Sequence, residues 1–308
     1  MIHLKALRKQ FGGLVAVNNV DLTIPRGEIY GLIGPNGAGK TTTIRMMCGL
    51  LSPTRGQVEI AGIDVSAEPE RAQQHIGYLS DFFAVYDDLK VWEYLDYFAR
   101  AYKMPDAEVP NRVQEVISEV NLQVKTDSMI SGLSRGMKQR LGIARAIIHK
   151  PDVLLLDEPA SGLDPKARFE LRVLLQKMRD QGATILISSH ILTELEGFCT
   201  SIGIMERGRL VRSGKIDEVA AESPVRAVDL RWIGHTSVPV SSVLSRFPEV
   251  SGAQLDASEG HFNFTGPDER LSDLVAALVS AKVRLTSFNE VKATVEDLYM
   301  RLSHHEVM

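Results

Sequence analysis

The chain has 308 residues, of which 44% are hydrophobic and 24% are charged, and its formal net charge is −4. This composition is typical of an ordinary folded protein, and the length suggests about two domains. The slightly acidic charge lacks the basic excess that usually accompanies nucleic-acid binding, so no nucleic-acid partner is predicted. The only cysteines are Cys48 and Cys199, which indicates no disulfide framework and fits a reducing compartment.

The sequence shows no sign of membrane insertion. The N-terminal stretch MIHLKALRKQF alternates apolar and polar residues, which favours a strand over a signal peptide. No run reaches the ~18–20 apolar residues that a membrane-spanning helix needs. Any role at a membrane is therefore expected to come through a partner.

Short apolar runs bounded by polar or turn residues recur along the first two thirds of the chain. Residues 1–27 predict short strands joined by turns. Four further runs are EIYGLI (28–33), IGYLS (76–80), VLLLD (153–157) and TILIS (184–188). Such runs are typical of strands buried on both faces of a parallel sheet, so an α/β fold is expected.

Helical patterns separate these strands. TTTIRMMCGLL predicts one helix, and the Asp-Pro pair at 164–165 predicts the start of another. A mostly helical insert lies between the runs at 76–80 and 153–157, where two amphipathic stripes indicate helices that face a core. The stripes are Val91, Leu95, Phe98 and Tyr102, followed by Val109, Val113, Val116, Ile117 and Val120.

The pattern changes at about residue 224. The segments VRAVDLRW, SVLSRF, VSGAQL, HFNFT, LSDLVAALVSA, VRLTSF and VEDLYMRL suggest the order β-α-β-β-α-β-α. That order suggests a small accessory α+β domain of the ferredoxin-like kind at 224–308. His304 and His305 near the end are interpreted as part of a polar tail and not as a metal site.

A glycine-rich loop follows the run at 28–33, in the motif GPNGAGKTT. It satisfies the pattern G-x-x-x-x-G-K-[ST] between a predicted strand and a predicted helix. Its backbone N–H groups and the helix N-terminus suit the phosphates of ATP or GTP, with Lys40 on the β- and γ-phosphates and Thr41 on Mg²⁺. The predicted nucleotide site comprises Gly34, Pro35, Asn36, Gly37, Ala38, Gly39, Lys40, Thr41 and Thr42.

Polar residues follow two of the predicted strands. VLLLDEP places Asp157 and Glu158 after a buried run, and ligands gather at the carboxyl ends of strands in open α/β sheets. Asp157 is suited to hold Mg²⁺, and Glu158 is suited to act as a base that orients the attacking water. The alternative is that both carboxylates are simply solvated residues at the end of a strand. His190, after TILISS, is placed to donate to the γ-phosphate, although an isolated histidine is more often structural.

The motifs GPNGAGKTT, LSRGMKQRL, VLLLDEP, SGLDP and SSH, in this order and spacing, resemble the ATP-binding cassette (ABC) ATPases over residues 2–220. The resemblance implies a P-loop fold with a parallel core sheet, an antiparallel β subdomain and a helical subdomain at about 88–150, within an ATP-binding domain at 1–220. It also implies that the LSRGMKQRL signature of one cassette caps the ATP of a second cassette. Ser134 and Gly136 would then contact the γ-phosphate across a homodimer or heterodimer.

The resemblance also assigns single positions. Phe11 matches the aromatic residue that stacks on adenine, with a plain core residue as the alternative, and Asp164 matches the loop that links the two hydrolytic sites. Two departures stand out, since the family usually has glycine at Arg135 and glutamine at Asp81. A carboxylate still suits a hard cation, so Asp81 joins Thr41 and Asp157 as a metal-site residue.

The resemblance implies an ATPase on the cytoplasmic face of the cell membrane, held there by an integral-membrane permease. In DFFAVYDDLKVWEYL, the aromatic residues Phe82, Phe83 and Tyr86 either form the floor of a groove that receives the permease or pack within the helical subdomain. The ending VKATVEDLYMRL resembles the tail of single-cassette ATPases of bacterial exporters, which favours export. The rival is a soluble ABC ATPase acting on ribosomes or DNA, which typically has two cassettes or a long coiled coil.

Overall fold

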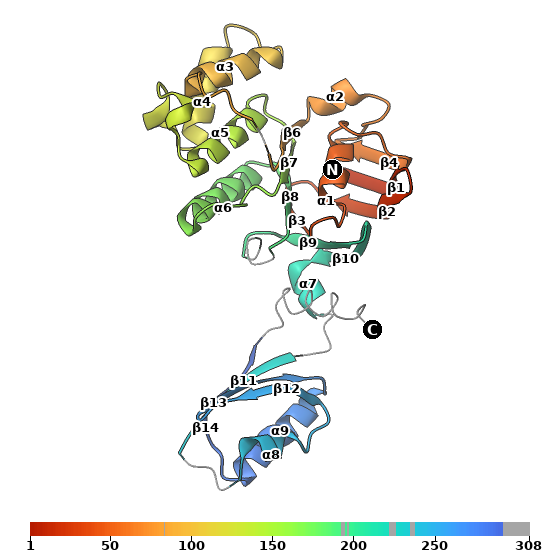
Figure 1. Cartoon of the computed structure of the whole chain (residues 1–308), viewed down its shortest axis with the longest axis vertical. Helices are drawn as coiled ribbons and strands as arrows, with labels where there is room; N and C mark the ends of the chain where they lie inside the picture. The colour runs from red at the N-terminus through yellow and green to blue at the C-terminus, as the bar shows by residue number, and fades with distance from the viewer. Residues whose placement is uncertain (83, 192–194, 196, 222–225, 235–237, 292–308) are drawn as a thin grey trace. The chain divides into compact units, whose positions relative to one another are not determined.

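The structure is a computed structural model that describes residues 1–82, 84–191, 195, 197–221, 226–234 and 238–291. The chain divides into two compact units, Met1–Lys215 and Ile216–Met308 (Figure 1). The division falls a few residues before residue 220, where the sequence led us to expect the end of the first domain. Each unit is described below by itself.

An antiparallel sheet opens the first unit. Its strands, in spatial order, are β2 (Leu14–Ile24), β1 (Ile2–Phe11), β4 (Arg55–Ile60) and β5 (Ile63–Asp64). The β1–β2 hairpin closes at Gly12 and Gly13, where Gly12 has a φ of +55° that suits glycine in a tight turn. Buried residues alternate with exposed ones along β2, which gives the sheet one face toward the core.

The central sheet has six strands. In spatial order they are β10 (Arg209–Lys215), β9 (Ser201–Glu206), β3 (Ile29–Ile33), β8 (Thr184–Ser189), β7 (Val153–Asp157) and β6 (Ile76–Leu79). Among the described strands of this sheet, β10 is the only one that runs antiparallel to its neighbour. Every residue of β3, β7 and β8 is buried, which explains their continuous apolar runs. The predicted parallel sheet is confirmed.

Helices cover the central sheet and extend beyond its β6 edge (Figure 1). The helices beside the sheet are α1 (Lys40–Met47), α2 (Pro69–Gln73) and α6 (Pro165–Asp180). The helical insert comprises α3 (Val91–Ala101), α4 (Val109–Glu119), the short turns η1 (Gln123–Lys125) and η2 (Ile130–Gly132), and α5 (Arg135–Ile147). The predicted valine stripe of α4 is buried, whereas Tyr102 is 42% exposed and Tyr94 takes the buried position on α3.

The second unit begins with α7 (Ile216–Ala221) and continues as a βαββαβ arrangement. Its elements are β11 (Arg226–Ile233), α8 (Val240–Leu244), β12 (Val250–Leu255), β13 (Glu259–Phe264), α9 (Asp268–Ser280) and β14 (Arg284–Val291). The antiparallel sheet has the order β12-β13-β11-β14, and its core includes Trp232, Phe262 and Leu274. The last predicted helix and the polar tail with His304 and His305 lie outside the described residues.

No helix in the part of the chain that the structure describes combines the length and apolar character required to cross a bilayer.

Candidate nucleotide-binding site

Three neighbouring strands deliver the predicted site residues to one edge of the central sheet. β3, β8 and β7 are parallel, with Ile33 opposite Ser189 and Asp157 opposite Ser188. The phosphate loop follows β3, Glu158 follows β7, and His190 follows β8. Because the carboxyl ends of parallel strands share an edge, these segments meet there.

The glycines of the phosphate loop are needed for steric reasons. Gly39 has a φ of +104°, and a Cβ there would lie 2.5 Å from the carbonyl oxygen of Ala16. A Cβ on Gly34 would overlap the carbonyl oxygen of Met205. Among the described residues, no side chain caps the N-terminus of α1, whose first N–H groups have no partner within the helix. This unsatisfied end fits an anion such as a nucleotide phosphate.

Lys40 lies over the loop in a buried ion pair. Its side chain is 6% exposed, and Nζ donates to the carbonyl oxygen of Gly34 at 2.7 Å. The same Nζ is 3.3 Å from Oε1 of Glu158, whose side chain is 10% exposed. Nδ1 of His190 lies 2.8 Å from the other carboxylate oxygen, Oε2. Both oxygens of the candidate base thus contact predicted site residues.

Asp157 lies at the bottom of the site and is 1% exposed. The Ser188 hydroxyl donates to Oδ1 of Asp157 at 2.5 Å and accepts from the backbone N–H of Glu158 at 3.0 Å. Oδ2 of Asp157 is buried without a hydrogen-bond partner among the described residues. Such an orphaned carboxylate oxygen is suited to Mg²⁺ or to a water bound by Mg²⁺, so the residues present fit this cation.

Ser188 has a structural role that the sequence did not assign. The sequence identified it only as a residue before His190, although its hydroxyl joins the side chain of Asp157 to the backbone of Glu158. Glu158 has a φ of +49°, which is uncommon for a residue with a side chain and carries a cost in strain. The bonds of Ser188 help hold this backbone in place. A serine at the end of a buried strand beside an Asp-Glu pair was the available signal.

Asp81, which stands where the family usually has glutamine, joins the same electrostatic environment. Partial burial, followed by the charges of Asp157 and Glu158, raises the pKa of the Asp81 carboxyl, whereas the charges of Arg135 and His190 oppose the rise. Among the described residues, no three His, Cys, Asp or Glu side chains form a group that could hold a metal ion alone. A cation here would therefore depend on phosphate oxygens, water and Thr41 as well.

Phe11 ends β1 with 47% of its surface exposed, so it is not a plain core residue. The ammonium group of Lys9 lies 5.1 Å from the centre of its ring. An exposed ring at a hairpin end is available to stack on a flat base.

The signature residues form a second group. Ser134 is the N-cap of α5, and its hydroxyl accepts from the N–H of Met137 at 3.3 Å. Asp164 is the N-cap of α6, and Oδ1 accepts from the N–H of Ala167 at 2.8 Å. Ser134, Gly136 and Asp164 line a pocket of about 240 Å³, and none of its lining residues belongs to the phosphate loop. The structure thus separates the two predicted phosphate-binding groups within one chain.

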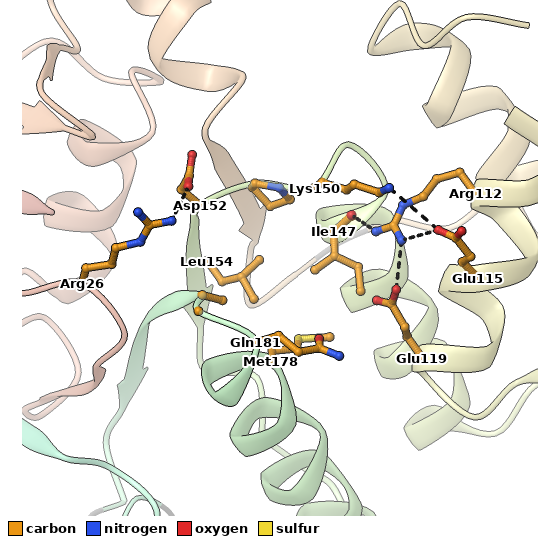
Figure 2. A pocket seen from close by; sticks show the side chains of 13 residues that line it. Arg26, Arg112, Glu115, Glu119, Ile147, Lys150, Asp152, Leu154, Met178 and Gln181 are labelled. Atoms are coloured by element: carbon orange, nitrogen blue, oxygen red, sulfur yellow. Dashed lines mark hydrogen bonds and ion pairs between the residues drawn. The ribbon is translucent and has the colours of Figure 1, made fainter. Parts of the chain in front are cut away.

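A larger pocket of about 450 Å³ is lined by Asp152 and Leu154, among other residues (Figure 2). Asp152 and Leu154 lie at the amino end of β7, whereas Asp157 lies at its carboxyl end. Arg112 is the most buried charged residue of the pocket. Its guanidinium donates to the carbonyl oxygens of Ile147 and Ile148 and contacts Glu115 and Glu119. Because these charges satisfy one another, we assign the pocket no ligand.

The glycine loop before α1, the buried lysine and the acidic pair at the end of β7 define a P-loop ATPase cassette. The family model for ABC transporters matches residues 17–161. The chain belongs to the ABC transporter family, as one of its ATP-binding proteins, because it also matches a curated member over almost the whole length of both chains, as given below. These comparisons confirm the family and fold that the sequence motifs indicated.

The relatives cover different shares of the chain. The probable multidrug ABC transporter ATP-binding protein YbhF of Escherichia coli is 39% identical over 72% of this chain, which spans 38% of that protein. The Nod factor export ATP-binding protein I of Burkholderia lata is 33% identical over 99% of this chain and 98% of its own length. The solved dimeric cassette MJ0796, in a post-hydrolysis state bound to ADP and Pi, is 28% identical with a TM-score of 0.63, over 70% of this chain and 98% of its own.

Proposed function

We propose that the chain binds ATP with Mg²⁺ and hydrolyses it to drive an ABC exporter. The observation that carries this proposal is the position of Glu158, whose two carboxylate oxygens contact Lys40 and His190. A carboxylate beside the phosphate-loop lysine suits a base that orients water toward the terminal phosphate. The name of one relative, the Nod factor export ATP-binding protein I, supports export, and a second relative is named a probable multidrug ABC transporter ATP-binding protein.

The ion pair between Lys40 and Glu158 suggests how binding prepares hydrolysis. ATP phosphates would attract Lys40 and draw it away from Oε1, since they carry more negative charge than a carboxylate. Oε1 would then be free to accept a hydrogen bond from water, while His190 holds Oε2. Mg²⁺, when bound, supplies neutralisation of phosphate charge, and Thr41, Asp81 and Asp157 are the residues proposed to hold it.

A second cassette would complete the site. Ser134 and Gly136 are assigned to the γ-phosphate of the partner's ATP, with Asp164 in the loop that links the two sites. Two features support this arrangement. The signature pocket has no phosphate-loop residue in its lining, and the related cassette MJ0796 is dimeric. Identical and non-identical second cassettes both remain compatible with these residues.

We further propose that an integral-membrane permease docks beside α3 and holds the chain at the cytoplasmic face of the membrane. Phe82 is 92% exposed, so it does not pack in the core of the helical insert. Tyr86 already contacts the helical insert, because its ring centre lies 6.2 Å from that of Tyr94. A pocket of about 280 Å³ nearby has an aromatic lining that includes Tyr78 and Tyr102. Phe83, the third residue of the proposed docking floor, lies outside the described residues.

Glu158→Gln tests hydrolysis. The variant should bind ATP but lose ~10²–10⁴-fold in turnover, because the amide cannot accept a proton from water. It should also accumulate as an ATP-dependent dimer, visible by light scattering after size exclusion. Normal turnover would show that Glu158 is not the base. A variant that stays strictly monomeric with saturating ATP and Mg²⁺ would contradict the proposal that a second cassette completes the site.

Phe82→Asp tests docking. The variant should lose co-purification with a membrane protein from detergent-solubilised membranes while keeping ATP binding, because a charge would replace an apolar contact. Val124→Asp is the matched control, since Val124 is an 88% exposed apolar residue elsewhere on the helical insert. Unchanged co-purification of the Phe82 variant would contradict the docking surface. Association with ribosomes or DNA instead of a membrane protein would favour the rival soluble ATPase.

A further inference from the structure

Arg135 lies between Ser134 and Gly136, but its side chain contacts its own chain. Nη2 donates to the carbonyl oxygen of Ser161 at 2.9 Å. The guanidinium lies against the backbone of Gly162, where a Cβ would overlap it and where φ is +65°. The contact thus depends on a glycine in the SGLDP loop. Such close packing indicates a built contact and not a loosely placed surface side chain.

Ser161 leads directly to the candidate base. The backbone N–H of Ser161 donates to the carbonyl oxygen of Glu158 at 3.1 Å, which closes a turn over residues 158–161. Glu158 occupies its left-handed conformation at one end of this turn, where the Ser188 hydroxyl holds its N–H. Arg135 holds the other end through the carbonyl group of Ser161. The turn that carries Glu158 is therefore fixed from both sides.

The surroundings link this turn to the signature. A Cβ on Gly136 would lie 3.1 Å from the Cβ of Ala167, so the first turns of α5 and α6 are in close contact. Arg135 thus connects two segments, the signature turn and the SGLDP loop.

We propose that Arg135 is a positioning residue that couples the signature turn to Glu158 of the same chain. The inference rests on the proposed function, because the signature turn matters only if it receives a partner's nucleotide. A movement of α5 caused by that nucleotide would reach Ser161 through one hydrogen bond and reach Glu158 through the next. Each cassette would then adjust its own base when it engages the nucleotide of the other cassette.

Arg135→Gly, which introduces the residue usual in the family, provides the main test. We expect kcat to fall about tenfold, the scale of one lost hydrogen bond from a charged donor, while the KM for ATP changes less than about twofold. In a Glu158→Gln background, ATP-dependent dimerisation should persist. Arg135→Lys, which keeps the charge and a donor, should recover part of the lost kcat. A merely structural side chain would not produce this separation of kcat from KM and dimerisation.

Lys138→Gln is the matched control. Lys138 also lies on α5, but its ammonium group pairs with Asp87 at 2.7 Å and it does not line the signature pocket. Its variant should keep kcat within about twofold of the wild type. Unchanged kcat in Arg135→Gly would overturn the inference. A parallel loss of dimerisation would also overturn the inference, because Arg135 would then act on the partner's nucleotide. A fall in activity that merely follows a fall in thermal stability would overturn it as well.

Gly162→Ala supplies an independent test, since the added Cβ displaces the guanidinium without removing its charge. We expect kcat to fall at least as far as in Arg135→Gly, because alanine is also strained at a φ of +65°. The effects of the two changes should combine less than additively, because both break the contact of the guanidinium with the loop. Additive effects would contradict the inference. A wild-type chain that hydrolyses no ATP in the presence of Mg²⁺, alone and with its membrane partner, would instead reject the proposed function.

Discussion

The phosphate loop and the signature turn both precede a helix, but their construction differs. The N-cap of α1 is Gly39, which is left-handed and provides no side-chain cap, whereas the N-cap of α5 is Ser134, whose hydroxyl already accepts from the first turn. Lys40 is buried in an ion pair, whereas Arg135 contacts an exposed loop. One site has its ligand-facing groups arranged within the chain. The other leaves a capped, accessible helix end for a nucleotide held elsewhere.

In the proposed two-cassette arrangement, this difference lets one fold serve two nucleotides. The buried loop is constrained by backbone contacts on several sides, so it is expected to fix its own nucleotide firmly. The signature turn has looser steric limits, since the added Cβ at Gly136 meets only the side chain of Ala167. Substitutions should therefore separate the two sites, with effects on ATP binding at the loop and effects on dimerisation at the turn.

Lys40→Ala should give the largest effect. It removes the buried cation from the phosphate loop, and ATP affinity should fall at least ~10²-fold, which corresponds to about two charge-assisted hydrogen bonds. The same change leaves Glu158 buried without its counter-charge, so the free energy of unfolding should fall by about 3 kcal/mol. A fluorescent-ATP titration and chemical denaturation measure the two effects.

The control is Lys138→Ala, which removes a lysine from the exposed side of α5. Its ion pair with Asp87 has an N–O distance of 2.7 Å, but the two side chains are 29% and 56% exposed. Exposed pairs contribute little, so ATP affinity and stability should change only slightly. Equal effects of the two lysine variants would mean that the phosphate loop is not the nucleotide site.

Paired glycine variants give the next effect. Gly39→Ala should abolish tight ATP binding and destabilise the chain by a few kcal/mol, because alanine is strained at a φ of +104° and its Cβ would lie 2.5 Å from a backbone oxygen. Gly136→Ala should leave ATP binding to the chain intact and reduce ATP-dependent dimerisation in the Glu158→Gln background. Similar behaviour of both variants in the ATP titration would break the distinction between the two sites.

The sequence predicted those parts of the site that depend on neighbours along the chain. The strand at 153–157 and the loop from Gly34 to Lys40 have strong local patterns, a continuous apolar run and a fixed glycine spacing. The strands β9 and β10, which pair antiparallel with each other, were not predicted, because their short apolar runs are interrupted by glycine and charge. Tyr102 was predicted as a core residue from its spacing, but it lies past the end of α3 and stacks on His149.

The contacts that connect the site depend instead on residues far apart in the sequence. No spacing rule relates Lys40 to Glu158, or Arg135 to the carbonyl group of Ser161. Ser188 holds Asp157 and Glu158 only because β7 and β8 are neighbours in the sheet. These contacts follow from strand order and helix packing, which local periodicity does not encode. They are also the contacts on which hydrolysis and coupling are proposed to depend.

Ser134→Ala should give the smallest effect and the sharpest test of the comparison. Loss of the N-cap bond to Met137 should lower the free energy of unfolding by about 1 kcal/mol. ATP binding to the same chain should not change, because none of the residues around the signature pocket belongs to the phosphate loop. Dimerisation of the Glu158→Gln protein should weaken several-fold, and Ser134→Thr, which keeps the hydroxyl, should restore it. If Ser134→Ala lowered stability but left dimerisation unchanged, the hydroxyl would be a helix cap alone, and the signature turn would lose its assigned contact with the partner's nucleotide.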